Sequence, residues 1–226
     1  MSCLRPARFD GVYFLVEGDG ERLATRNLTP GVSILGEKLV KWEGQEYRLW
    51  SPYRSKLSAA ILNGLKRLPI TEGSTVLYLG AASGTTASYV SDIVGERGTV
   101  FCVEFGPRPM KELLRVCELR SNMVPILADA RRPDGYAHLV TEVDSAYQDV
   151  AQPNQAEIFC LNVRAYLRQA GSGILMVKSR SVDVARKPED IFREEMDRLT
   201  QSGILIEETV LLHPFDKDHI AIVGSI

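Results

Sequence analysis

The chain contains 226 residues, of which 45% are hydrophobic. That length and composition suit one sizeable α/β domain with a small appendage, and they argue against two domains of equal size. Lys and Arg number 27 and Asp and Glu number 29, which gives a formal net charge of −2. This balance excludes a global positive field that attracts nucleic acid, so any RNA must be bound through a local patch or through another protein.

The cysteines and the apolar runs indicate the compartment. Four cysteines show no CxxC pairing, and most fall in predicted strands or helices, where a thiol packs as a small hydrophobe. No apolar run approaches the roughly 18 residues of a membrane span. We therefore expect a reduced, cytoplasmic protein without a membrane partner.

Residues 1–52 predict a small antiparallel β subdomain. Short alternating runs at 12–16 and 47–50 are separated by segments rich in glycine, as in hairpins. Ser51-Pro52 then leads into a first helix, expected near 55–68 and ended by Pro69.

From residue 75 onward, predicted strands and helices alternate, which is typical of a parallel sheet covered on both faces. The strands are expected at about 75–79, 100–103, 124–127, 143–148 and 173–177, and the helices at about 86–94, 107–120, 153–170 and 188–202. Residues 204–211 and 219–223 leave no room for a crossover helix and predict an antiparallel hairpin. This α/β architecture for residues 53–226 resembles the Rossmann-like class I methyltransferases.

The segment 76–86, VLYLGAASGTT, predicts a strand, a tight loop and the start of a helix. Gly80 and Gly84 permit a sharp turn and a close backbone approach to a ligand. Glu104 ends the next predicted strand, 20 residues beyond Gly84, where an acidic side chain can accept hydrogen bonds from ribose hydroxyls. The loop lacks the middle glycine of a pyrophosphate site, so S-adenosylmethionine suits it better than NAD, although an ordinary turn is the alternative.

Polar side chains follow every predicted parallel strand, where ligands bind in open α/β sheets. They are Thr85 and Thr86, Glu104, Asp129, Asp149 and Lys178. Any one of them could instead cap a helix, stabilise a turn or be a solvated lysine. All of them together predict a site at this edge.

Three segments resemble the fibrillarin family: EYRLWSPYRSKL at 46–57, DVAQP at 149–153 and KDH at 217–219. The resemblance extends from about Gly11 to Val223 and includes LATRNL at 23–28. No stretch rich in glycine and arginine, as in eukaryotic members, is present, so we expect the archaeal type. Tyr147-Gln148 is bulkier and more polar than the family pattern.

The resemblance implies an S-adenosylmethionine-dependent RNA ribose 2′-O-methyltransferase that needs no metal. It implies rRNA, and possibly tRNA, as the target within a box C/D guide-RNA complex, with a Nop-type coiled-coil scaffold and a kink-turn-binding protein as partners. Cofactor contacts are implied for Thr85, Thr86, Glu104, Phe105, Asp129, Ala130, Asp149, Val150, Ala151 and Gln152. A catalytic set is implied for Lys56, Asp149, Lys178 and His219.

The chemistry of methyl transfer is compatible with those roles. A ribose 2′-hydroxyl is a poor nucleophile, so the enzyme must align it with the methyl donor and remove a proton. Lys178 is our candidate base, with Lys56 as a second cation and Asp149 orienting the Lys178 ammonium. His219 either positions the ribose or satisfies a hydrogen bond of the hairpin. A non-catalytic ribonucleoprotein subunit and, less well supported, a dehydrogenase are the alternatives.

Overall fold

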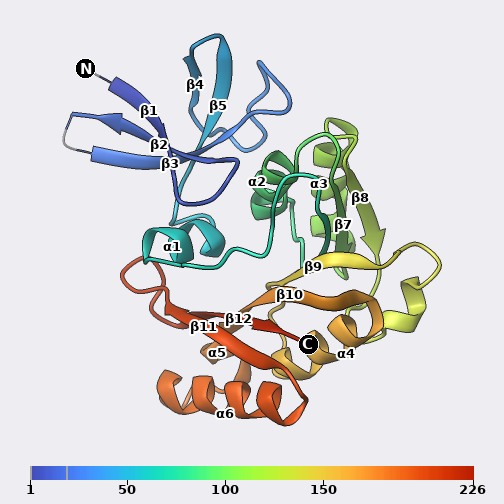
Figure 1. The fold of residues 1–226 in the computed structure, drawn as a ribbon. Helices are drawn as coiled ribbons and strands as arrows, with labels where there is room; N and C mark the ends of the chain where they lie inside the picture. The colour runs from blue at the N-terminus through green and yellow to red at the C-terminus, as the bar shows by residue number, and fades with distance from the viewer. Residues whose placement is uncertain (1, 19) are drawn as a thin grey trace.

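The computed structural model describes residues 2–18 and 20–226 and contains two sheets (Figure 1). The larger sheet has seven strands in the order β11-β12-β10-β9-β6-β7-β8. Its strands are β6 (Thr75–Leu79), β7 (Thr99–Glu104), β8 (Met123–Leu127), β9 (Val143–Gln148), β10 (Leu167–Lys178), β11 (Leu205–Leu211) and β12 (His219–Ser225). The five strands from β6 to β10 are parallel, and β12 runs antiparallel to both β10 and β11. The Rossmann-like fold and the terminal hairpin are therefore confirmed.

Helices cover both faces of this sheet. They are α1 (Lys56–Leu62), α2 (Thr85–Val94), α3 (Pro107–Glu118), α4 (Gln155–Tyr166), α5 (Ser179–Val182) and α6 (Pro188–Gln201), with a 3-10 helix η1 at Pro133–Tyr136. Alternate strand residues face opposite ways. One apolar core therefore joins the sheet to α1, α2 and α3, and a second joins it to α4 and α6. Within the described residues, no helix has both the length and the apolar character needed to span a membrane.

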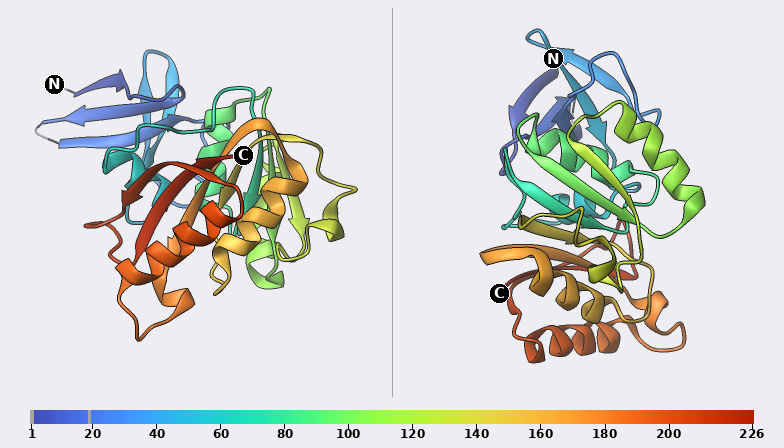
Figure 2. Two further views of the ribbon diagram at one scale, coloured as in Figure 1. Left: turned by 60° about the horizontal axis from the view of Figure 1, so that its bottom comes forward. Right: turned by 90° about the vertical axis from the view of Figure 1, so that its right-hand side faces the viewer.

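The N-terminal segment forms a separate antiparallel sheet at one end of the molecule (Figures 1 and 2). Its strand order is β1-β2-β3-β5-β4, made from β1 (Ser2–Pro6), β2 (Val12–Glu17), β3 (Gly20–Arg26), β4 (Leu39–Trp42) and β5 (Gln45–Trp50). The end of β5 leads directly into the loop that precedes α1. This sheet therefore determines where α1, and with it Lys56, begins.

A buried ion cluster centred on Asp92 of α2 joins the two sheets. The Asp92 carboxylate lies 2.8 Å from Arg48 Nη1 of β5 and 2.6 Å from Arg120 Nη1 after α3. Thr25 Oγ1 of β3 donates to the same carboxylate at 2.7 Å. Separating the sheet from α2 would leave the buried charges of Arg48 and Asp92 without partners, which is strongly unfavourable. The cluster therefore holds the N-terminal sheet against α2.

Two predicted helices are too long. The helix expected over 55–68 ends at Leu62, because Gly64 follows with a φ of 91° and the Asn63 amide donates to the carbonyls of Leu211 and His213. The helix expected over 153–170 begins at Gln155 and ends at Tyr166. Leu167 has an extended backbone and pairs with Val143 of β9, so the chain turns directly into β10.

Candidate active site

A cleft of about 280 Å³ lies beyond the carboxyl ends of β6, β7 and β9. Its walls come from four loops that are far apart in the sequence and meet because parallel strands end at the same edge. Among its lining residues are Gly80, Glu104, Phe105, Asp129, Ala130, Asp149, Val150, Ala151 and Gln152. The structure thus brings together nine of the predicted site residues.

The loop after β6 is held by backbone geometry and by Glu104. Gly80 has a φ of 79°, and a Cβ atom there would lie 2.5 Å from the carbonyl oxygen of Asp149, so only glycine fits. Glu104 accepts hydrogen bonds from the backbone N–H of Ala82 at 2.8 Å and of Gly106 at 2.7 Å. The Glu104 carboxylate therefore fixes the two loops between which a ligand enters.

Gly84, Thr85 and Thr86 do not line this cleft. Gly84 caps α2 in the left-handed region and packs against α3, where a Cβ atom would lie 3.0 Å from Leu113 Cδ1. Thr86 is buried, and its hydroxyl donates to Ser55 Oγ at 3.0 Å. Thr85 lines a neighbouring cavity of about 710 Å³. These residues link the start of α2 to the loop before Lys56.

Lys56 and Asp149 form a close ion pair at the edge of the cleft. Lys56 Nζ lies 2.9 Å from Asp149 Oδ1 and 2.7 Å from Oδ2, and the two side chains are 25% and 21% exposed. Ser55 caps α1 by accepting from the backbone N–H of Ser58, which sets the start of the helix at Lys56. The expectation that Asp149 orients the Lys178 ammonium is wrong in this structure, because Lys56 holds both oxygens of that carboxylate.

Lys178 and His219 are direct neighbours on adjacent antiparallel strands, at the end of β10 and the start of β12. The Lys178 ammonium makes no hydrogen bond or ion pair with the described part of the chain, whereas its backbone is bound by Gln155. His219 is almost fully buried. Sequence analysis did not identify Gln155, because its contact with Lys178 spans 23 residues.

The surroundings of His219 favour its neutral form. Burial lowers the pKa of the imidazole, the Lys56 charge lowers it further, and Asp216 opposes both. Nδ1 lies 2.6 Å from Asp216 Oδ1, yet neither ring nitrogen has a hydrogen-bond partner of acceptable geometry in the described chain. The contact with Asp216 lies within the turn of the hairpin, so a structural role for His219 and a role toward the ribose both stay predictions.

Asp129 and Phe105 occupy the outer wall of the cleft. Arg131 donates to both carboxylate oxygens of Asp129, the closest contact being 2.6 Å from Nη2 to Oδ2. This hydrogen bonding is the main reason that the pKa of Asp129 is lowered. Phe105 is 64% exposed, so its ring is available at the mouth of the cleft.

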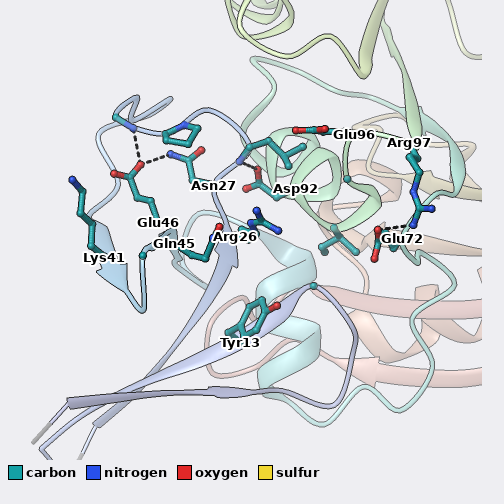
Figure 3. Close-up of a pocket in the computed structure, with 17 residues that line it drawn as sticks. Tyr13, Arg26, Asn27, Lys41, Gln45, Glu46, Glu72, Asp92, Glu96 and Arg97 are labelled. Carbon is teal, nitrogen blue, oxygen red and sulfur yellow. Dashed lines mark hydrogen bonds and ion pairs between the residues drawn. The ribbon is translucent and has the colours of Figure 1, made fainter.

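A larger cavity, of about 990 Å³, lies away from these residues (Figure 3). It separates the N-terminal sheet from the C-terminal end of α2, beside the segment that precedes β6. Several of its charged groups are satisfied by one another or by the backbone. Glu72 pairs with Arg97, and Glu46 accepts from Asn27 and from the N–H of Gly31. We therefore place the active site at the smaller cleft, which Asp149 lines and beside which Lys56 pairs with that carboxylate.

Comparison with known proteins identifies the family. The Fibrillarin family model matches residues 4–226. A curated relative from Thermococcus sibiricus, the fibrillarin-like rRNA/tRNA 2′-O-methyltransferase, is 54% identical over 217 residues, which cover 96% of each chain.

Two solved structures are also similar. The fibrillarin of Aeropyrum pernix, in complex with natively bound S-adenosyl-L-methionine, is 47% identical with a TM-score of 0.91, and the match covers 99% of this chain and 100% of that one. A chain of a fibrillarin/Nop5p complex is 38% identical with a TM-score of 0.83, covering 97% of this chain and 98% of the other. A family match over nearly the whole length, together with this degree of identity, shows that the chain belongs to the fibrillarin family.

Proposed function

We propose that this chain transfers a methyl group from S-adenosylmethionine to the ribose 2′-hydroxyl of rRNA, and possibly of tRNA. The observation that carries the proposal is the position of the Lys56–Asp149 ion pair, which reaches an acidic cleft through Asp149 and acts through its charges on His219, the strand neighbour of Lys178. The names of the relatives agree with this activity. The nine cleft residues described above are proposed to bind the cofactor.

The charges of the cleft fit S-adenosylmethionine better than a dinucleotide. Glu104, Asp129 and Asp149 line it, and Arg131 is the one cation among its described lining residues. That arginine is already paired with Asp129. A pyrophosphate would be repelled by these carboxylates, whereas a sulfonium, an amino group and ribose hydroxyls would be attracted to them.

When bound, the cofactor supplies an electrophilic methyl group on a positively charged sulfur. Lys178, in its neutral amine form, is placed to take the proton of the 2′-hydroxyl and so becomes an ammonium, and no ion pair within the described chain occupies this side chain. Lys56 holds the Asp149 carboxylate in place at the rim. His219, whose pKa is lowered mainly by burial, can exchange a hydrogen bond with the ribose.

The proposed setting is a box C/D guide-RNA complex. One relative has been solved with Nop5p, so a Nop-type coiled-coil scaffold is the first partner proposed. Guide RNA and a kink-turn-binding protein complete the proposal. Because the net charge is −2, the chain alone offers little electrostatic affinity for RNA, and we propose that its partners supply most of that affinity.

Two measurements test the function. Calorimetric titration with S-adenosylmethionine and with NAD should show binding of the first alone. Mapping of 2′-O-methyl groups after reconstitution with guide RNA, scaffold and kink-turn-binding protein should show methylation at the guided nucleotide. Binding of NAD alone would indicate a dehydrogenase, and cofactor binding without any methylation would indicate a structural subunit.

A further inference from the structure

The side-chain amide of Gln155, the first residue of α4, bonds to both the N–H and the C=O of Lys178. Its Oε1 accepts from the Lys178 N–H at 2.8 Å, and its Nε2 donates to the Lys178 carbonyl at 3.1 Å. The side chain is fully buried. Because one contact requires an acceptor and the other a donor, only one orientation of the amide satisfies both.

These two hydrogen bonds replace those that a neighbouring strand would make with Lys178. β9 ends at Gln148, which pairs with Leu175, whereas β10 continues for three more residues to Lys178. Backbone groups buried beyond the end of a neighbouring strand need other hydrogen-bond partners. The Gln155 amide offers one acceptor and one donor, as a residue of a parallel ladder would.

A second buried glutamine supports the first. Gln148 Nε2 donates to the carbonyl oxygen of Gln155 at 2.7 Å. The residue after Gln148 is Asp149, which holds Lys56. The chain of contacts Gln148–Gln155–Lys178 therefore connects the strand end that carries the ion pair with the strand end that carries the proposed base.

Gln148 lowers the stability of the fold relative to an apolar residue at the same position. Its Oε1 is buried and has no partner among the described residues. An unsatisfied buried acceptor costs about 1–3 kcal/mol, which an apolar residue at this position would avoid. A polar residue that costs stability next to a reactive centre points to a role in the site.

The strand register determines how Lys178 faces His219. The Ser179 N–H donates to the Asp218 carbonyl, so Lys178 and His219 form a non-hydrogen-bonded pair, and the N–H and C=O of Lys178 bond to Gln155 instead. Side chains lie closer together in non-hydrogen-bonded pairs of this kind. Movement of the Lys178 backbone would therefore change the position of its ammonium group relative to the imidazole.

We propose that Gln155, supported by Gln148, is a positioning residue that holds Lys178 at the correct distance from the target hydroxyl. The proposal rests on the function proposed above. It assigns no contact with substrate or cofactor to either glutamine. Their effect on methyl transfer passes through Lys178.

The test measures single-turnover methyl transfer by the reconstituted guide-RNA complex at saturating S-adenosylmethionine. Gln155→Met keeps the volume and removes both bonds, and we expect a rate loss of about 10²-fold, as for a small misplacement of a reacting group. Gln148→Met removes only the support and should cost less. If Gln155→Met does not fold, Gln148→Met still tests the proposal. It leaves Gln155 itself, and the place of its carbonyl in α4, unchanged. Affinity for the cofactor should stay within about twofold, below the size of one lost hydrogen bond.

Glu195→Gln is the matched control. Glu195 is also fully buried and accepts from the N–H of Ala156, the neighbour of Gln155. It does not reach Lys178, so its variant should lower the melting temperature without a specific loss of the single-turnover rate.

The decisive comparison repeats Gln155→Met and Gln148→Met in a Lys178→Ala background. If the glutamines act through Lys178, they should cause little further loss there. An equal loss in both backgrounds, or weakened cofactor binding, would overturn the proposal. A wild-type complex without activity would instead refute the proposed function, so the two failures are distinguishable.

Discussion

Glu104 acts on two loops at once, which makes it the first residue to remove. Glu104→Ala leaves the N–H groups of Ala82 and Gly106 without their acceptor and removes the proposed acceptor for ribose hydroxyls. We expect the affinity for S-adenosylmethionine to fall by about 1–3 kcal/mol in a calorimetric titration. The fold should survive, as circular dichroism can verify. Unchanged affinity of the folded variant would remove Glu104 from the cofactor site.

Lys178 should affect chemistry and not binding. Lys178→Ala removes the proposed base from the end of β10, so the single-turnover rate should fall by about 10²-fold or more. Cofactor affinity should remain near that of the wild type, because Lys178 does not line the cleft. A wild-type rate under saturating cofactor would mean that another residue, or water, accepts the proton.

Single residues were predicted better than their partners. Strand ends can be read from the sequence, so Glu104, Asp149 and Lys178 were identified by position alone. Side-chain pairing depends on tertiary contacts, and Lys56 and Asp149 are 93 residues apart. For that reason Asp149 was expected to orient Lys178, and its ion pair with Lys56 was not predicted.

Among the secondary-structure elements, neither strands nor helices matched prediction throughout. The strands β6 and β9 have the predicted bounds, whereas β10 begins at Leu167, six residues before its predicted start at 173. The helices α2, α3 and α6 lie within two residues of their predicted bounds. The helices α1 and α4 are shorter than predicted, although Leu65 and Leu68 beyond α1 are still buried. An apolar spacing of helical type continues into an irregular segment there, so periodicity alone could not locate the end.

The segment between β3 and β4 depends on a carboxylate that should make the protein sensitive to acid. Burial raises the pKa of Glu37, but the charge of Arg48 and hydrogen bonds overcome this effect and lower it from 4.5 to about 2. The side chain is only 6% exposed and lies 2.6 Å from Arg48 Nε. A depressed pKa stabilises the native state above pH 4.5, and this contribution is lost as the pH falls toward 2.

We therefore expect the free energy of unfolding to decrease by up to about 3 kcal/mol between pH 5 and pH 2 through this residue, at 1.36 kcal/mol per pKa unit. Urea denaturation at a series of pH values measures it. Glu37→Gln should be less stable at neutral pH and should show a smaller decrease in acid. Parallel curves for both proteins would show that other carboxylates dominate the acid response.

For the whole molecule, charge limits what the chain can do alone. Six cations lie in the sequence near the strand ends and the first helix, where they could form a local patch: Arg54, Lys56, Arg131, Arg132, Lys178 and Arg180. In the structure Lys56, Arg131 and Arg180 are paired with Asp149, Asp129 and Asp218. Fewer positive charges are therefore available for phosphates than the sequence indicated.

Weak binding of RNA by the isolated chain follows from this pairing. Non-specific affinity for nucleic acid comes mainly from the release of counterions by unpaired cations, and the net charge is −2. We expect the protein alone to methylate target RNA poorly and the reconstituted complex to methylate the same RNA efficiently at physiological salt. Methyl incorporation by the two preparations provides the measurement, with a guide RNA of unrelated sequence as the control. Equal rates would show that the chain recognises RNA unaided and would contradict the guide-dependent function.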